Sequence, residues 1–169
     1  MNPLSTRGPG SGPSWDREKG ELRILGHRNA AVDVRALCEY LDSLVGVQVG
    51  EVIMKNLETR LGREDGVWLR KENPQLSPNE LINIITEWDR MAGIGATRAT
   101  FIENPASSML LEVANPIVKA TQGAARAFLF GWWAGLLSSI LGRDFEYTNV
   151  IYDPAKDSMR CEFVPRSTK

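Results

Sequence analysis

The spacing of apolar residues changes several times along the chain, and each change marks an expected element. Residues 21–27 (ELRILGH) alternate polar and apolar side chains, which predicts a short strand. Asn29 follows and is expected to cap the next helix. Apolar residues then recur at helical spacing over 32–45, up to a break at Gly46.

A second amphipathic helix is expected over 49–61, closed by Gly62. The run Ser77-Pro78-Asn79-Glu80 places a capping serine, a first-turn proline and a glutamate three residues on, which predicts a helix start. This helix is expected to stop at Gly93.

Strand patterns follow over 95–102 and 107–113, separated by an Asn-Pro turn. Two more, 145–152 and 159–164, bracket a five-residue polar loop and predict a β-hairpin. Strands and helices in this order indicate an α+β fold, in which an antiparallel sheet packs against a layer of amphipathic helices.

The segment 122–141 is expected to be a long buried helix, because it is apolar on almost every face. Small residues recur in it at every fourth position and stack on one face of a helix. These residues are Gly123, Ala127, Gly131, Gly135 and Ser139. Such a row of small residues has three possible roles: it can let another backbone pack closely, form a dimer interface, or line a ligand pocket. Trp132 and Trp133 point about 100° apart, so one is expected in the core and the other at a pocket or a partner surface.

Composition narrows the possible functions. The chain has 169 residues, 43% apolar and 24% charged, and a formal net charge of −1. These values fit one globular domain over 21–166, after a Gly-, Pro- and Ser-rich leader (1–20) that is expected to be disordered. Scattered basic residues argue against nucleic-acid binding. The uncharged run 127–142 is shorter than the roughly 20 residues that span a bilayer.

Candidate chemistry is sparse. Two cysteines far apart and one histidine offer no disulfide framework and no paired-cysteine zinc motif, and free thiols fit a cytoplasmic location. The chain contains no nucleophile elbow, P-loop, dinucleotide fingerprint or His-Glu-x-x-His motif. We therefore expect no cofactor and favour a binding module over an enzyme.

The C-terminal half resembles a known family. Its residues are Ile102-Glu103-Asn104 after a strand, then FLFGWWAGLLSSILGRDFE within 123–146, and a hairpin ending Cys161-Glu162-Phe163-Val164. In this order they resemble the small-molecule-binding domain named after 4-vinyl (protochlorophyllide) reductase, over roughly 95–165. The resemblance over 21–94 is limited to the order and spacing of helices.

This resemblance implies an α+β unit, often homodimeric, with a pocket between helices and sheet. Such domains occur in tetrapyrrole biosynthesis proteins and in sensory modules of aromatic-responsive transcription regulators, and subunits of a vesicle-tethering complex share the fold. Aromatic-sensing members carry zinc near the C-terminus. Here only Cys161 matches a ligand, so we expect no zinc site.

The leading hypothesis is a cytoplasmic, homodimeric sensor or carrier that binds a small hydrophobic or aromatic molecule. The helices 77–92 and 122–141 and the inner sheet face would line the pocket, with candidate residues Trp88, Phe101, Leu110, Phe128, Trp132 and Leu136. Arg126 is either a solvated end of the helix or the partner of an acidic ligand group. The alternatives are an enzyme or accessory factor of tetrapyrrole metabolism and a ligand-free dimerisation scaffold.

Overall fold

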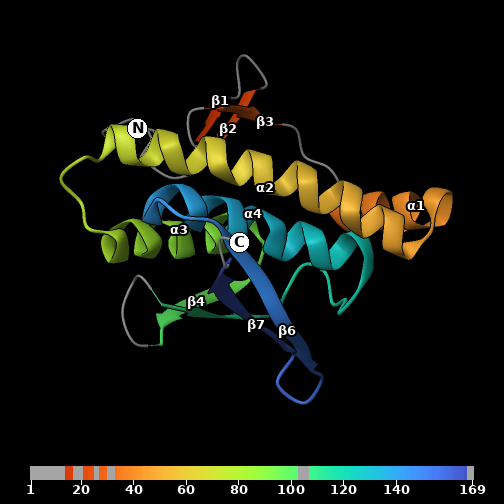
Figure 1. Cartoon of the computed structure of the whole chain (residues 1–169). Helices are drawn as coiled ribbons and strands as arrows, with labels where there is room; N and C mark the ends of the chain where they lie inside the picture. The colour runs from red at the N-terminus through yellow and green to blue at the C-terminus, as the bar shows by residue number, and fades with distance from the viewer. Residues whose placement is uncertain (1–13, 17–20, 25–26, 30–32, 103–106, 167–169) are drawn as a thin grey trace.

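The computed structural model describes residues 14–16, 21–24, 27–29, 33–102 and 107–166. In Figure 1 the long helix α2 forms an upper layer, α3 and α4 a middle layer, and a four-stranded sheet the lower one. The helices are α1 (Val34–Val45), α2 (Val47–Glu72), α3 (Pro78–Ala92) and α4 (Gly123–Leu141). The strands are β1 (Ser14–Asp16), β2 (Glu21–Ile24), β3 (His27–Asn29), β4 (Ala96–Phe101), β5 (Met109–Ala114), β6 (Phe145–Asp153) and β7 (Ser158–Pro165). The predicted α+β class is confirmed.

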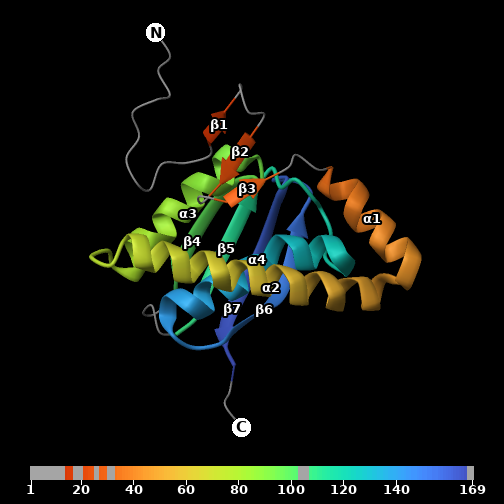
Figure 2. The ribbon, with the colours of Figure 1, turned by 90° about the horizontal axis from the view of Figure 1, so that it is seen from above.

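The main sheet is antiparallel with strand order β4-β5-β7-β6, and Figure 2 shows α2 crossing over its strands. Side chains alternate between its faces. Met109, Leu111 and Val113 of β5 are buried on the inner face, toward the helices. The outer face carries a cross-strand row of Arg98, Glu112 and Arg160, whose opposite charges suit a solvated surface.

The N-terminal elements differ from expectation. The expected strand 21–27 falls into two antiparallel strands, β2 and β3. The expectation that Asn29 caps the next helix is wrong: Asn29 lies in β3, and Asp33 caps α1 by accepting a hydrogen bond from the backbone of Ala36 at 3.0 Å. Ser14–Asp16 of the expected leader pairs with β2, whereas 1–13 and 17–20 lie outside the described residues.

Helix α2 does not end at Gly62 as expected but continues for ten more residues, to Glu72. A helix-interior glycine costs about 1 kcal/mol against alanine, so tertiary packing must compensate. Gly62 is buried against α4, where an added Cβ would lie 2.8 Å from the carbonyl carbon of Trp132. Gly62 is therefore a contact point between two helices and not a helix end.

Helix α3 follows its sequence signals closely. The Ser77 hydroxyl accepts from the backbone of Glu80, and the Glu80 carboxylate accepts from the backbone of Ser77 at 2.8 Å, so the capping box is complete. Gly93 ends the helix with a left-handed φ of 77°, a conformation that glycine adopts without steric cost.

Helices α2 and α4 interlock through small residues. Gly131 and Gly135 of α4 face the backbone of α2, while Gly62 and Gly66 of α2 face that of α4. Polar contacts join the same two helices, since Thr59 donates to the Gly131 carbonyl and Ser139 to that of Arg63. The predicted row of small residues on α4 is therefore a helix-packing surface.

The main core lies between α4 and the inner face of the sheet. Phe130, Leu136, Leu137, Met159 and Phe163 are all fully buried there. By length and composition α4 is the one helix in the described part of the chain that could cross a membrane, but 67% of its apolar window is buried inside the protein. Its place in this core accounts for its apolar composition.

Candidate ligand site

Two carboxylates from other helices meet the first turn of α4. The backbone N–H of Gly123 donates to Glu51 of α2 at 2.9 Å, and that of Ala124 donates to Asp42 of α1 at 3.0 Å. Gln122, the capping position, supplies no side-chain hydrogen bond of its own. Free N–H groups and the helix dipole favour negative charge here. The two carboxylates thus tie α1 and α2 to the start of α4.

Arg126 lies one turn further along α4 and forms an ion pair with Glu51. Neither side chain is freely solvated, with 30% of Arg126 and 17% of Glu51 exposed. Arg126 is therefore a partly exposed residue at the N-terminal end of α4 whose charge is paired with a carboxylate of the protein itself. Its guanidinium carbon lies 5.9 Å from the ring centre of Tyr147 on β6, and the Lys55 ammonium of α2 lies 4.9 Å from the same centre.

Tyr147 lies next to Arg126 and Lys55, and its hydroxyl is buried without a hydrogen-bond partner. Only 8% of the residue is exposed. The buried Nε of Arg126 has no hydrogen-bond partner either. Burial raises the pKa of the Tyr147 phenol well above its usual value, Glu51 adds to the rise, and Arg126 opposes it. The guanidinium is close enough to lower the pKa of the phenol both by its charge and as a weak hydrogen-bond donor, although the geometry of the two groups falls outside that of a regular hydrogen bond.

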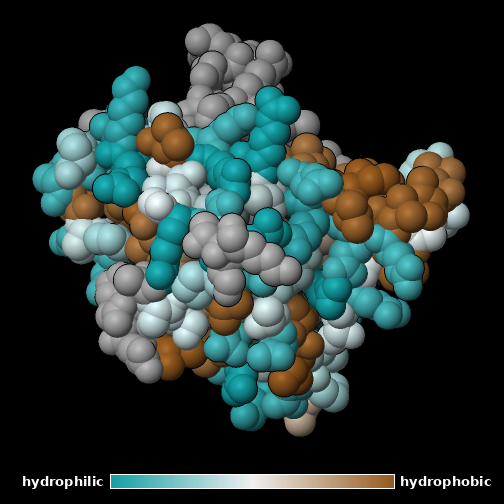
Figure 3. Space-filling model, in the orientation of Figure 1, coloured by the Kyte–Doolittle hydropathy of each residue, from teal (hydrophilic) through white to brown (hydrophobic). Residues whose placement is uncertain are grey.

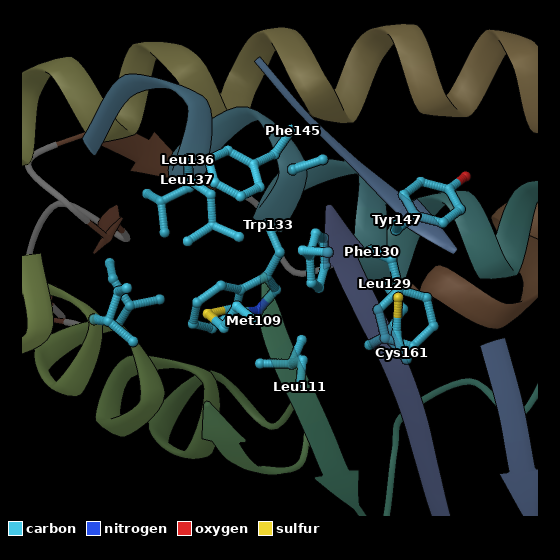
Figure 4. Packing of buried hydrophobic residues seen from close by; sticks show 14 of the residues in the cluster. Met109, Leu111, Leu129, Phe130, Trp133, Leu136, Leu137, Phe145, Tyr147 and Cys161 are labelled. Atoms are coloured by element: carbon cyan, nitrogen blue, oxygen red, sulfur yellow. The ribbon is translucent and has the colours of Figure 1, made fainter. Parts of the chain in front are cut away.

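The ring of Tyr147 packs against that of Phe130, which in turn packs against that of Phe163. The Phe130 ring centre is 6.1 Å from that of Tyr147 and 6.4 Å from that of Phe163. Figure 4 shows the Tyr147 hydroxyl pointing toward α2, away from Phe130. We call Glu51, Lys55, Arg126, Tyr147 and Phe130 the Tyr147 cluster. It combines an apolar ring surface with buried, unpartnered hydrogen-bond donors.

Cys161 lies on β7 and is fully buried. Burial raises the pKa of its thiol, which contacts the carbonyl of Thr148 at 3.5 Å. In the described ranges no three His, Cys, Asp or Glu side chains gather in a way that could hold a metal ion. The expected absence of zinc stays a prediction, and elemental analysis of the purified protein tests it.

A second buried polar group lies further along α4, at Trp133. The Asp89 carboxylate of α3 accepts hydrogen bonds from Thr97 at 2.9 Å and from the Trp133 indole at 3.0 Å. Burial raises the pKa of Asp89 to about 6, and its two hydrogen bonds oppose the rise. The Thr97 hydroxyl and the Trp133 indole N–H thus both donate to Asp89, and these hydrogen bonds link α3, β4 and α4.

Five of the six predicted pocket residues lie in the main core or pack against it, and Leu110 is the exception; that they bind a ligand stays a prediction. Trp88 and Leu136 are buried in the main core. Phe101 pairs with Met109 and so shares the inner sheet face, whereas Leu110 faces the opposite side.

The remaining two predicted residues lie on α4. Phe128 packs against both the main core and a small cluster around Cys38 and Met54. Trp132 is half-buried and donates to Asp65 of α2 at 2.7 Å. Of the adjacent pair Trp132 and Trp133, Trp133 is the one buried in the core. Phe128 is thus the predicted residue nearest in sequence to Arg126 and Phe130.

Sequence analysis missed Tyr147, Glu51 and Lys55. Tyr147 is one of several apolar positions in a strand pattern, and Glu51 and Lys55 look like the polar side of an amphipathic helix. Their spacing of four residues puts them on one helix face, which is a usable but common signal. Only the isolated charge of Arg126 within an apolar helix pointed to this place.

No family model matches this chain, and no curated protein matches it. Among solved structures it is similar to the phenol-responsive sensory domain of the transcription activator PoxR with phenol. The TM-score is 0.75 at 10% identity, covering 90% of this chain and 84% of that one. A trafficking protein particle complex subunit 3 from Naegleria fowleri, covalently bound to palmitic acid, gives a TM-score of 0.43 at 13% identity, covering 80% and 96%. The first similarity establishes a shared fold, and the family resemblance stays a prediction.

Proposed function

We propose that this domain binds a small hydrophobic or aromatic molecule at the Tyr147 cluster. The observation that carries the proposal is the pair of buried donors, the Tyr147 hydroxyl and the Arg126 Nε, without partners. A buried donor left unpaired costs about 1–3 kcal/mol. A ligand oxygen that accepts hydrogen bonds from both donors would remove this cost, and binding would gain that free energy. The similarity of the fold to a phenol-responsive sensory domain supports the same class of ligand.

The chemistry of the cluster specifies the ligand further. Phe130 is fully buried against Tyr147 and Phe163, so the apolar body of a ligand would reach this ring only if one of the two neighbouring rings moved aside. The polar group of the ligand would accept hydrogen bonds from Tyr147 and Arg126. The positive charges of Lys55 and Arg126 are matched by the carboxylates of Glu51 and Asp42 at the start of α4, so charge alone does not favour an anionic over a neutral acceptor.

Tyr147→Phe tests this proposal through two opposite effects. Without ligand, the variant is expected to be more stable by about 1 kcal/mol, because an unpaired buried hydroxyl is removed. Binding of benzoate or phenol is expected to weaken about tenfold or more, because the ligand loses a hydrogen-bond donor. Chemical unfolding and calorimetric titration measure the two.

Tyr152→Phe is the matched control, because that hydroxyl donates to Asp157 in the loop of the hairpin and lies outside the cluster. It should leave affinity unchanged. If neither probe binds the wild-type protein, and native mass spectrometry finds no co-purified small molecule, the proposal fails. Equal affinity in wild type and Tyr147→Phe would reject this cluster as the site.

We further propose that the domain acts as a dimeric cytoplasmic sensor or carrier. The two buried free cysteines suit a reducing compartment. A ligand-free dimerisation scaffold is the second candidate, favoured by the fully buried side chains around α4 and its close contact with α2. Native mass spectrometry separates the two, because only the first predicts a dimer with bound small molecules.

A further inference from the structure

Helix α1 buries very little of its apolar side. It is an amphipathic helix of 12 residues, yet Cys38 is its single buried residue. Leu37, Tyr40 and Leu44 are 46%, 64% and 61% exposed. On a helical wheel these three lie together, beside the edge that carries Cys38. A helix face of this kind is normally covered by another element.

The apolar surface continues onto α2. Val49, Ile53, Leu57 and Leu61 follow one another at four-residue spacing and form one stripe. This is the apolar face seen in the sequence, but the fold buries the neighbouring stripe that contains Gly62 and Gly66. The outward stripe is therefore not needed for the contact between α2 and α4.

Together these residues form a surface that we call the α1–α2 surface. Its ten large apolar side chains are each 41–64% exposed: Leu37, Tyr40, Leu44, Val45, Val47, Val49, Val52, Ile53, Leu57 and Leu61. Figure 3 shows part of it as the brown area over α1 and the adjoining end of α2. Monomeric proteins rarely expose a continuous apolar patch of this kind unless it has a function.

We propose that the α1–α2 surface binds the same surface of a second copy of this chain. The size suffices: ten residues that are 41–64% exposed present roughly 900 Å² of mostly apolar surface. A standard interface buries about 800 Å² per partner, of which roughly 60% is apolar. The exposed apolar area thus exceeds what one side of a stable dimer requires.

The shape agrees as well. A two-fold axis across the α2 stripe would pair it with its own copy in the antiparallel direction, as an isologous interface. Stripes at four-residue spacing pack into one another in the commonest class of helix pairs. At its C-terminal end the stripe is bordered by an exposed ion pair between Arg60 and Glu64, at 3.1 Å. That pair would form the polar rim.

This inference deepens the dimeric part of the proposed function and is independent of ligand binding. Wild type is expected to be a dimer by sedimentation equilibrium of the full chain. Leu44→Glu combined with Leu57→Glu is expected to raise the dimer dissociation constant by about 100-fold or more, since each places a charge in an apolar interface. Both positions are exposed in one chain, so circular dichroism should show an unchanged fold.

Ile151→Glu is the matched control, because Ile151 is 53% exposed on β6, outside this surface. It should remain a dimer. A second measurement uses Ile53→Cys with a short bismaleimide, which should link two chains, whereas Ile151→Cys should not; the native cysteines are buried. A monomeric wild type, a dimer unaffected by the double variant, or equal linking of both cysteine variants would overturn the proposal. Tyr147→Phe should stay dimeric, which separates this result from a failure of ligand binding.

Discussion

Gly135→Ala is expected to destabilise the protein by about 3 kcal/mol or more, through overpacking between α2 and α4. A methyl group at this position would lie 2.8 Å from the carbonyl carbon of Thr59, 2.9 Å from the amide of Arg63, and closer still to the Thr59 oxygen. All three are backbone atoms of α2, so no side-chain rotation can make room. The helices would have to separate along their shared length.

Gly131→Ala provides the graded comparison. Its added methyl group would meet the Cβ of Glu58 at 3.0 Å and the backbone of Lys55 at 3.5 Å. A shift of a few tenths of an ångström relieves this, and alanine favours the helix by about 1 kcal/mol over glycine. The expected loss is therefore small, below about 1 kcal/mol. Urea unfolding measures both variants, and equal losses would show that the contact at Gly135 is not the tight one.

The sequence carried enough information for most of the fold. The Ser77 capping box, the breaks at Gly46 and Gly93, and the hairpin around 153–157 are local signals, and each matches an element of the structure. The apolar character of 122–141 predicted a buried central helix, which α4 is. Local rules sufficed wherever the decisive interactions lie within a few residues.

The course of α2 could not be predicted in the same way. Gly62 resembles a helix end in isolation, and only the distant Trp132 carbonyl, against which it packs, explains a helix-interior glycine. The apolar stripe of Val49 to Leu61 likewise suggested a buried face. Which face of α2 is buried depends on the helix that packs against it. Gly131 and Gly135 of α4 allow a close approach to the face with Gly62 and Gly66, so the Val49–Leu61 face stays exposed.

The residues of the Tyr147 cluster were not expected together from the sequence, for the same reason. The Tyr147 cluster joins residues from α2, α4 and β6 that are up to 96 positions apart, from Glu51 to Tyr147. No short motif brings them together. Large apolar residues on predicted elements were a reasonable choice of pocket, but most such residues fill a core. An isolated charge within an apolar helix was the more informative signal.

Asp89→Ala is expected to destabilise the protein by about 3 kcal/mol at pH 5, because the Thr97 hydroxyl and the Trp133 indole N–H would both lose their buried acceptor. Asp89→Asn keeps an acceptor oxygen of the same size and is expected to stay within about 1 kcal/mol of wild type at that pH. Denaturant unfolding of the two variants separates the hydrogen bonds from the charge. Equal losses would mean that packing volume, not hydrogen bonding, sets the cost.

Ionisation of Asp89 is expected to make the free energy of unfolding depend on pH. Burial raises the pKa of Asp89 from 3.8 to about 6, so the folded state holds its proton more tightly than the unfolded chain. This stabilisation is complete below pH 4 and is lost as the pH rises to about 6, by an amount on the order of 2–3 kcal/mol.

Buried Glu58 acts in the same direction, because burial raises its pKa to about 7. The measurement therefore compares Glu58→Gln with the double variant Glu58→Gln, Asp89→Asn. The single variant should lose stability between pH 4 and 6, and the double variant should lose much less. Parallel pH profiles would show that Asp89 is ionised in the folded protein at acidic pH, with its charge stabilised by the Thr97 and Trp133 hydrogen bonds alone.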